Sequence, residues 1–103
     1  MTSDPRLALA CDLAALAPAE RGRRTQLAES LRANTVRWDE TETGYAIQLR
    51  DDPETLAVAE ELMALENRCC SFLTLRLVRD RAILEVSGAP GAKAFIAAEM
   101  DLL

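Results

Sequence analysis

The chain has 103 residues, half of them apolar, and a formal net charge of −5 at pH 7. This length is typical of one domain, so we expect a single domain over residues 1–103. An acidic chain repels phosphate backbones, and this excludes nucleic acid as an expected partner. No apolar run reaches the ~18 residues that a membrane-spanning helix needs, so we also expect no membrane partner.

The apolar stretch near the N-terminus does not follow the pattern of a signal peptide. Residues 7–17 are apolar apart from Asp12, but Arg6 is the single basic residue ahead of them and Asp12 interrupts the run. We predict an extended stretch over residues 7–13 that carries Cys11 toward the core. The chain has three cysteines and no histidine, and the odd number disfavours a secreted disulfide scaffold. The sequence therefore predicts a cytoplasmic protein with reduced thiols.

A first helix is expected over residues 18–33. Pro18 suits the first helical position, because its missing N–H would have no intrahelical partner there. Leu27 and Leu31 are four residues apart and share one face. Asn34 suits the C-cap position.

Alternating apolar and polar residues predict four strands in two hairpins. The first hairpin covers residues 35–39 and 45–50, and the second covers residues 72–78 and 83–87. Three leucines at alternate positions of the third strand share one face. Asp80-Arg81 is expected to form the tight turn of the second hairpin, although it lacks the usual glycine.

Two further helices are expected, one between the hairpins and one after them. Over residues 53–69, the start Asp52-Pro53-Glu54 supplies a capping carboxylate and a proline for the first turn. Spacings of four, three and four define the buried stripe of this helix: Val58, Leu62, Leu65 and Cys69. The final helix follows a break at residues 88–91, with an inner face of Phe95, Ile96, Met100 and Leu103.

This order of elements predicts an α+β fold. We expect a four-stranded, mainly antiparallel sheet of two hairpins, with about three helices packed on one face. The other face is expected to carry Phe72, Val78 and Trp38. These exposed apolar residues make a homodimer a candidate assembly.

Two charged groups are expected to be solvated helix faces: the arginines Arg21, Arg23 and Arg24, and the glutamates Glu60, Glu61 and Glu66. Because the chain has no histidine, it has no Cys–His or Ser–His nucleophile pair. No phosphate-loop or dinucleotide pattern occurs. We therefore assign no catalytic and no cofactor-binding residue, and the sequence favours a protein that is not an enzyme.

The adjacent cysteines Cys69 and Cys70 are the best candidates for chemistry. Their Cα atoms are about 3.8 Å apart, which is too close for an unstrained disulfide. Thiolates bind soft metals well, and two tethered thiols need little ordering to meet one ion. The negative end of the helix dipole favours a cation and disfavours a bare thiolate, whereas Arg68 acts in the opposite direction. Three cysteines without histidine suit two- or three-coordinate binding of a soft ion better than a four-ligand zinc site.

Residues 65–73, Leu-Glu-Asn-Arg-Cys-Cys-Ser-Phe-Leu, resemble a small, largely uncharacterised bacterial family with a Glu-x-x-Cys-Cys-Pro-Phe box. The opening Cys11-x-Leu13 and the closing segment 87–95 are also similar to that family. Its members occur near mercury-type resistance genes and metal-responsive regulators, so the resemblance implies heavy-metal thiol chemistry. It also implies that Cys11 joins the cysteine pair as a third thiolate. Ser71 stands where the family has proline, which alters the end of the helix.

The sequence leaves three functions open. The first is a cytosolic carrier or detoxification protein that binds a soft heavy-metal ion (Hg, Cu(I), As or Zn) through Cys69, Cys70 and Cys11. The second is a thiol redox or metal-detoxifying enzyme, in which Cys70 attacks and Cys69 resolves. The third is a dimeric interaction domain whose cysteines simply pack in the core.

Overall fold

The computed structural model describes residues 13–69, 72–89 and 91–99. These residues form helices and strands in the predicted order. The elements are η1 (Leu13–Ala15), α2 (Pro18–Ala33), β1 (Thr35–Glu40), β2 (Gly44–Leu49), α3 (Pro53–Cys69), β3 (Leu73–Val78), η2 (Arg79–Arg81), β4 (Ile83–Gly88) and α4 (Ala92–Glu99). The predicted bounds of α2 and α3 are confirmed.

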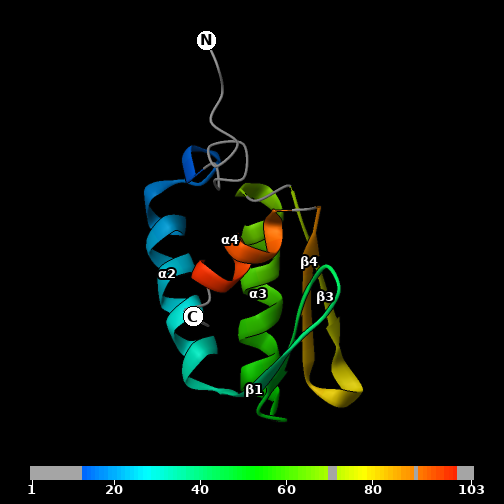
Figure 1. Ribbon diagram of the computed structural model, residues 1–103. Coiled ribbons are helices and arrows are strands. Elements are labelled where there is room, and N and C mark those ends of the chain that lie inside the picture. The colour runs from blue at the N-terminus through cyan, green and yellow to red at the C-terminus, as the bar shows by residue number, and fades with distance from the viewer. Residues whose placement is uncertain (1–12, 70–71, 90, 100–103) are drawn as a thin grey trace.

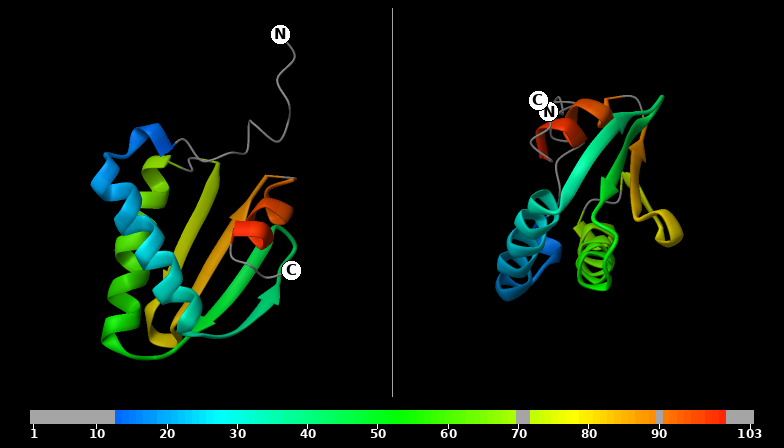
Figure 2. Two further views of the ribbon diagram at one scale, coloured as in Figure 1. Left: turned by 90° about the vertical axis from the view of Figure 1, so that its left-hand side faces the viewer. Right: turned by 90° about the horizontal axis from the view of Figure 1, so that it is seen from below.

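The four strands form one antiparallel sheet in the order β1-β2-β4-β3. The hairpins β1–β2 and β3–β4 join through the central pairing of β2 with β4. Helices α2, α3 and α4 all cover the same face of this sheet (Figure 1; Figure 2). Helices α2 and α3 pack side by side, whereas α4 lies across β2 and β4. The predicted α+β architecture is confirmed.

The core lies between this sheet face and the helices. Ile47 of β2 is directly opposite Leu84 of β4, and Tyr45 is opposite Val86. Residues opposite each other in an antiparallel pair share a face. Because the helices cover this face, all four residues are buried. The other face is mostly polar and carries the ion pair between Arg76 and Glu85, 3.1 Å apart.

The predicted apolar patch on the open face is wrong at two of its three positions. Trp38 is opposite Ile47, so it lies on the helix side of the sheet, where its ring packs edge-on against Tyr45 at 5.3 Å. Phe72 precedes β3 and packs against Phe95 of α4, with ring centroids 5.0 Å apart. Strand alternation leaves only Val78 of the three on the open face. The pattern misled because Phe72 lies outside the strand and a register shift follows Thr35 in β1.

The helix ends are fixed by local side chains. The backbone N–H of Thr55 donates to Asp52 Oδ1 at 2.8 Å, and the Thr55 hydroxyl donates to Asp52 Oδ2 at 3.0 Å, which caps α3. The N–H of Ala17 donates to Glu20 Oε1 at 2.9 Å at the start of α2. The Asn34 side-chain amide donates to the Ser30 carbonyl at 2.8 Å at its end. These contacts confirm the predicted caps at Asp52 and Asn34.

The second hairpin turns without glycine. Residues Arg79–Arg81 form the short η2 turn, and Ala82 adopts a left-handed conformation with φ of 52°. The predicted tight turn at Asp80-Arg81 is confirmed in position.

Several predictions fall outside the described residues. They concern the extended stretch with Cys11, Cys70, and the inner-face residues Met100 and Leu103. Within the described ranges, no helix combines the length and apolar character needed to span a membrane.

The cap at Asp52 predicts a specific acid sensitivity. The Thr55 hydrogen bonds hold the pKa of the Asp52 carboxyl below its usual range. The stabilisation by the ionised Asp52 carboxylate is therefore complete above the unfolded pKa of about 3.9. It is lost as the pH falls through the lower pKa of the folded state. Asp52→Asn, which keeps a capping oxygen, should show a smaller fall in thermal midpoint than the wild type between about pH 6 and about pH 2.

The matched control is Asp51→Asn, one position earlier and exposed. It should follow the wild-type acid profile. Identical profiles for the wild type and Asp52→Asn would contradict the role given to this carboxylate.

Candidate functional site

Cys69 is the last residue of α3 and is buried, with 4% of its surface exposed. It continues the apolar stripe of Leu62 and Leu65, as predicted, and both leucines are buried as well. Val58, the first predicted member of the stripe, is partly buried. The thiol therefore points toward the interior at the end of the helix.

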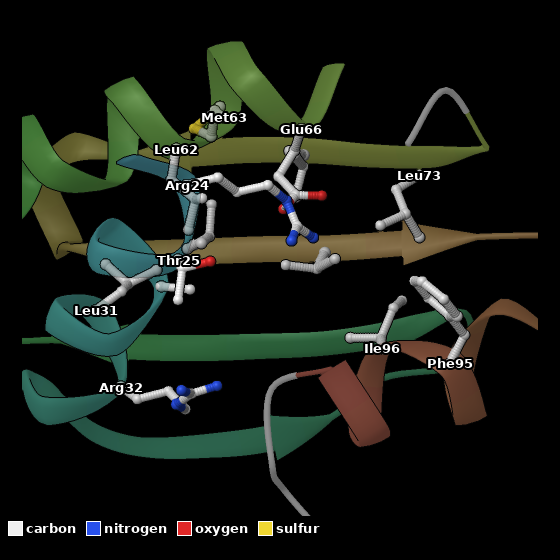
Figure 3. A pocket seen from close by; sticks show the side chains of 14 residues that line it. Arg24, Thr25, Leu31, Arg32, Leu62, Met63, Glu66, Leu73, Phe95 and Ile96 are labelled. Atoms are coloured by element: carbon white, nitrogen blue, oxygen red, sulfur yellow. Dashed lines mark hydrogen bonds and ion pairs between the residues drawn. The ribbon is translucent and has the colours of Figure 1, made fainter. Parts of the chain in front are cut away.

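The neighbours of this thiol are charged groups as well as hydrocarbon. Arg24 of α2 makes a side-chain hydrogen bond to Cys69, and Glu66 lies one helical turn before it. Arg24 Nε and Glu66 Oε1 are 2.7 Å apart, and their side chains are 15% and 13% exposed. Figure 3 shows the guanidinium and the carboxylate side by side between α2 and α3. Cys69 thus lies beside a largely buried ion pair.

The predicted solvated faces are therefore wrong at Arg24 and Glu66. Arg23 and Glu61 form the exposed ion pair that a solvated face would give, with 2.6 Å between Arg23 Nε and Glu61 Oε2. Glu60 is likewise exposed and pairs with Arg79. One charged pair along the α2–α3 contact is buried, and its neighbours remain at the surface.

The helical repeat contained the signal for this pair. Arg24 comes three residues before Leu27 and seven before Leu31, so it belongs to the buried stripe of α2. Glu66 comes four residues after Leu62 and three before Cys69, so it belongs to the buried stripe of α3. The charge of Arg24 and Glu66 predicted a solvated position, whereas their spacing from the buried residues predicted an inner-face position.

Burial raises the pKa of the Cys69 thiol above its usual value. The negative charge of Glu66 raises it further, while the charge and hydrogen bond of Arg24 act in the opposite direction. The thiol is accordingly protonated at neutral pH. A bound cation that displaced this proton would meet the negative end of α3 and the Glu66 carboxylate.

Arg68 ties the N-terminal segment to the same end of α3. Its Nη2 donates to the Ala15 carbonyl at 3.3 Å and to Glu20 Oε1 at 3.2 Å. The Arg68 hydrogen bond also holds the pKa of the Glu20 carboxyl below its usual range. As a result η1 and the start of α2 lie beside the last turn of α3, as the views of the fold show (Figure 1; Figure 2).

A cavity of about 230 Å³ opens next to the ion pair. Its walls come from α2, α3, α4 and the helix-covered face of β3 and β4. Arg24 and Glu66 line it together with apolar side chains such as Met63, Leu84 and Ile96 (Figure 3). Arg24 therefore contacts the Cys69 thiol and, with Glu66, also lines this largely apolar cavity.

Of the predicted metal ligands, Cys69 alone belongs to the described residues; Cys11 and Cys70 lie outside them. In residues 13–69, 72–89 and 91–99, no group of three histidine, cysteine or carboxylate side chains is arranged to hold a metal ion. The three-cysteine site thus stays a prediction.

Comparisons of the chain with protein-family models, curated proteins and solved structures found no match.

The buried ion pair should behave as a unit in unfolding experiments. Arg24→Met removes the guanidinium from the Glu66 carboxylate and should cost about 3 kcal/mol of unfolding free energy, because a buried charge loses its counter-charge. Arg24→Met combined with Glu66→Leu should cost clearly less than the sum of the single changes. Urea denaturation of the four proteins measures the coupling.

The exposed pair Arg23 and Glu61 supplies a matched control on the same two helices. The same cycle on this pair should give little coupling, since solvent screens exposed charges. Additive losses at Arg24 and Glu66 would contradict the assignment of a coupled buried pair.

Proposed function

We propose that this chain is a small cytoplasmic protein that binds a soft heavy-metal ion through Cys69 and Cys70, with Cys11 as the third ligand. The ion is of the class of Hg(II), Cu(I), As(III) or Zn(II), and the role is that of a carrier or of detoxification. Soft thiolates favour such ions, and adjacent thiols are already tethered for chelation.

The observation that carries the proposal is the Arg68 contact. Arg68, the residue before Cys69, donates a hydrogen bond to the Ala15 carbonyl. Cys11 precedes Leu13, the first residue of η1, by two positions. The partner of Arg68 is Ala15, four positions after Cys11, and four residues span at most about 14 Å, so the contact limits how far the segment that bears Cys11 can lie from the end of α3. The sequence alone gives no such limit, because Cys11 and Cys69 are 58 positions apart.

The electrostatics of Cys69 support metal binding over nucleophilic attack. A reactive thiol needs a lowered pKa, whereas burial and Glu66 raise the pKa of this one. The Glu66 carboxylate and the negative end of α3 would favour a bound cation, whereas Arg24 opposes it, and a metal ion can deprotonate the thiol on binding. In the alternative of a thiol redox or detoxifying enzyme the attacking thiol is Cys70, which lies outside the described residues, so the pKa of Cys69 argues only against attack by Cys69 itself.

The resemblance to the family with the Glu-x-x-Cys-Cys box adds to this proposal. Glu66 occupies the glutamate position of that box, and in this fold its carboxylate is largely buried beside Cys69. A carboxylate held there would stabilise a cation at the neighbouring sulfurs. Ser71 in place of proline remains a departure from the family pattern.

One observation favours a homodimer, the assembly that the third candidate requires. Strand β1 forms an edge of the sheet, and Val36 and Trp38 on it are 64% and 39% exposed. An edge strand with exposed apolar side chains can pair with a second copy of itself. This assembly is compatible with metal binding, because β1 lies at the edge opposite to β3, the strand that follows the cysteines.

Metal titration tests the proposal directly. The reduced protein should bind one Hg(II) ion in native mass spectrometry, with apparent affinity rising with pH as protons cease to compete. Cys69→Ser and Cys70→Ser should each weaken binding by more than about 100-fold, beyond the usual cost of losing an outer-shell partner.

Met63→Leu is the control for a sulfur outside the proposed site, and it should bind as the wild type does. Titrations with Cu(I), As(III) and Zn(II) rank the ions. Stoichiometric binding that survives both serine variants would contradict the proposal.

The participation of Cys11 has its own test. Arg68→Gln releases η1 from α3, so it should weaken Hg(II) binding in the wild type but have no further effect in Cys11→Ser. The reason is that the Arg68 contact should affect Hg(II) affinity only by positioning Cys11 as the third thiolate. Competition titration against a chelator of known affinity measures the four proteins.

Arg23→Gln is the matched control, since Arg23 also forms an exposed ion pair with a neighbouring helix. Equal weakening by Arg68→Gln in both backgrounds would show that the contact acts through stability instead of through Cys11.

A further inference from the structure

Strand β1 forms one edge of the sheet, and among the described residues β2 is its only strand neighbour (Figure 2). All residues of β1 after Thr35 are exposed. An edge strand presents a row of backbone donors and acceptors to any strand that approaches it. The outer side of β1 is therefore a surface on which a further strand can pair.

The printed pairing of β1 with β2 determines which backbone groups face outward. The N–H of Thr41, directly after β1, donates to the Gly44 carbonyl at 2.8 Å. Alternate residues of an antiparallel pair direct their backbone groups to the partner strand, so Arg37 and Asp39 face β2 as Thr41 does. Trp38, the residue between them, directs its N–H and C=O away from the sheet.

The side chains of Arg37 and Asp39 give this edge two opposite charges on the open face of the sheet. They form a within-strand ion pair, with 3.6 Å between Arg37 Nε and Asp39 Oδ2, and are 70% and 66% exposed. This pair leaves most of each side chain in solvent. A second partner can therefore be added without breaking the first contact.

Charge selects one register for the antiparallel pairing of β1 with a second copy of itself. If Val36 were opposite the second copy's Trp38, the two Arg37 side chains would face each other. If Trp38 were opposite Glu40, the two Asp39 side chains would face each other. With Trp38 opposite Trp38, each Arg37 faces an Asp39. Opposite charges across strands are favourable and like charges are unfavourable, so the third register is preferred.

We infer that two copies of the chain pair through β1 in the register that places Trp38 opposite the second copy's Trp38. Each Arg37 then contacts its own Asp39 and that of the second copy, so the four charges alternate around the two-fold axis. On the helix side the two indole rings meet, each already packed against Tyr45 at 5.3 Å. No cysteine takes part, so the inference is independent of the proposed metal site.

The opposite edge of the sheet, β3, lacks this self-complementarity. Its sequence, Leu-Thr-Leu-Arg-Leu-Val, contains Arg76 as its single charged residue. Two copies of β3 therefore form no pair of opposite charges. Pairing of β1 with β3 of another copy would leave an edge free on each side and would build open chains instead of a closed dimer.

Charge reversal tests the register by sedimentation velocity, with a reductant and a chelator present so that neither disulfides nor metal ions link two copies. The wild type should become dimeric within about 1–500 µM, as a small interface gives a weak complex. Arg37→Asp and Asp39→Arg should each dimerise at least tenfold more weakly, because like charges meet at both contacts between the copies.

An equimolar mixture of the two variants should dimerise as the wild type does, since each contact between copies again joins opposite charges. The within-strand pair stays broken in both chains, so this recovery reports only on contacts between copies. Arg76→Asp is the matched control on β3 and should leave dimerisation unchanged. A monomeric wild type, a mixture that does not recover, or oligomers larger than a dimer would overturn the inference.

Trp38 gives a second readout in the unmodified chain, because it is the only tryptophan. Its emission should shift to shorter wavelength over the concentration range in which the dimer forms, as the two rings exclude water from each other. Arg37→Asp should not show this shift. Dimerisation without any change in tryptophan emission would place the contact elsewhere and overturn the inference.

Discussion

The ion pair between Arg24 and Glu66 joins the two long helices beside the buried thiol of Cys69. Both side chains are largely withdrawn from water, so each charge depends on the other. The pair contacts Cys69 on one side and lines the cavity on the other. The pair therefore modifies the proton affinity of the thiol, which burial raises first, and it supplies charged groups to the wall of the cavity.

A pair of this kind is costly in a domain of 103 residues. Two hydrophobic residues of similar size would commonly be as stable or more so, because desolvation opposes the attraction between the charges. Its presence on the inner stripes of both helices is therefore informative. In the proposed metal site, Glu66 would favour a cation at Cys69, while Arg24 balances the charge of Glu66.

The exposed Arg68 side chain adds a second connection between α3 and the start of α2. They fasten η1 and the first turn of α2 to the last turn of α3, so residues far apart in sequence meet at one end of the helix pair. The side chain of Leu16, between η1 and α2, is buried in the core and anchors the same segment by apolar contact. The proposed third thiolate depends on the placement of this segment.

The sequence by itself determined the local structure. Caps at Asp52 and Asn34 and the repeat of α3 are short-range features, so their predictions were confirmed. The α+β class followed from the order of the elements. The positions of Phe72 and Trp38 were predicted wrongly, because a residue outside a strand and a register shift change which side a side chain takes.

The tertiary structure alone decided which charges are buried and which segments meet. The pairing of Arg24 with Glu66 requires two helices to pack at a particular height, and the contact of Arg68 with Ala15 requires the chain to return to the end of α3. Both contacts are long-range, so no local pattern specifies the partner. Residue spacing could assign Arg24 and Glu66 to inner faces, but only packing could bring them together beside Cys69.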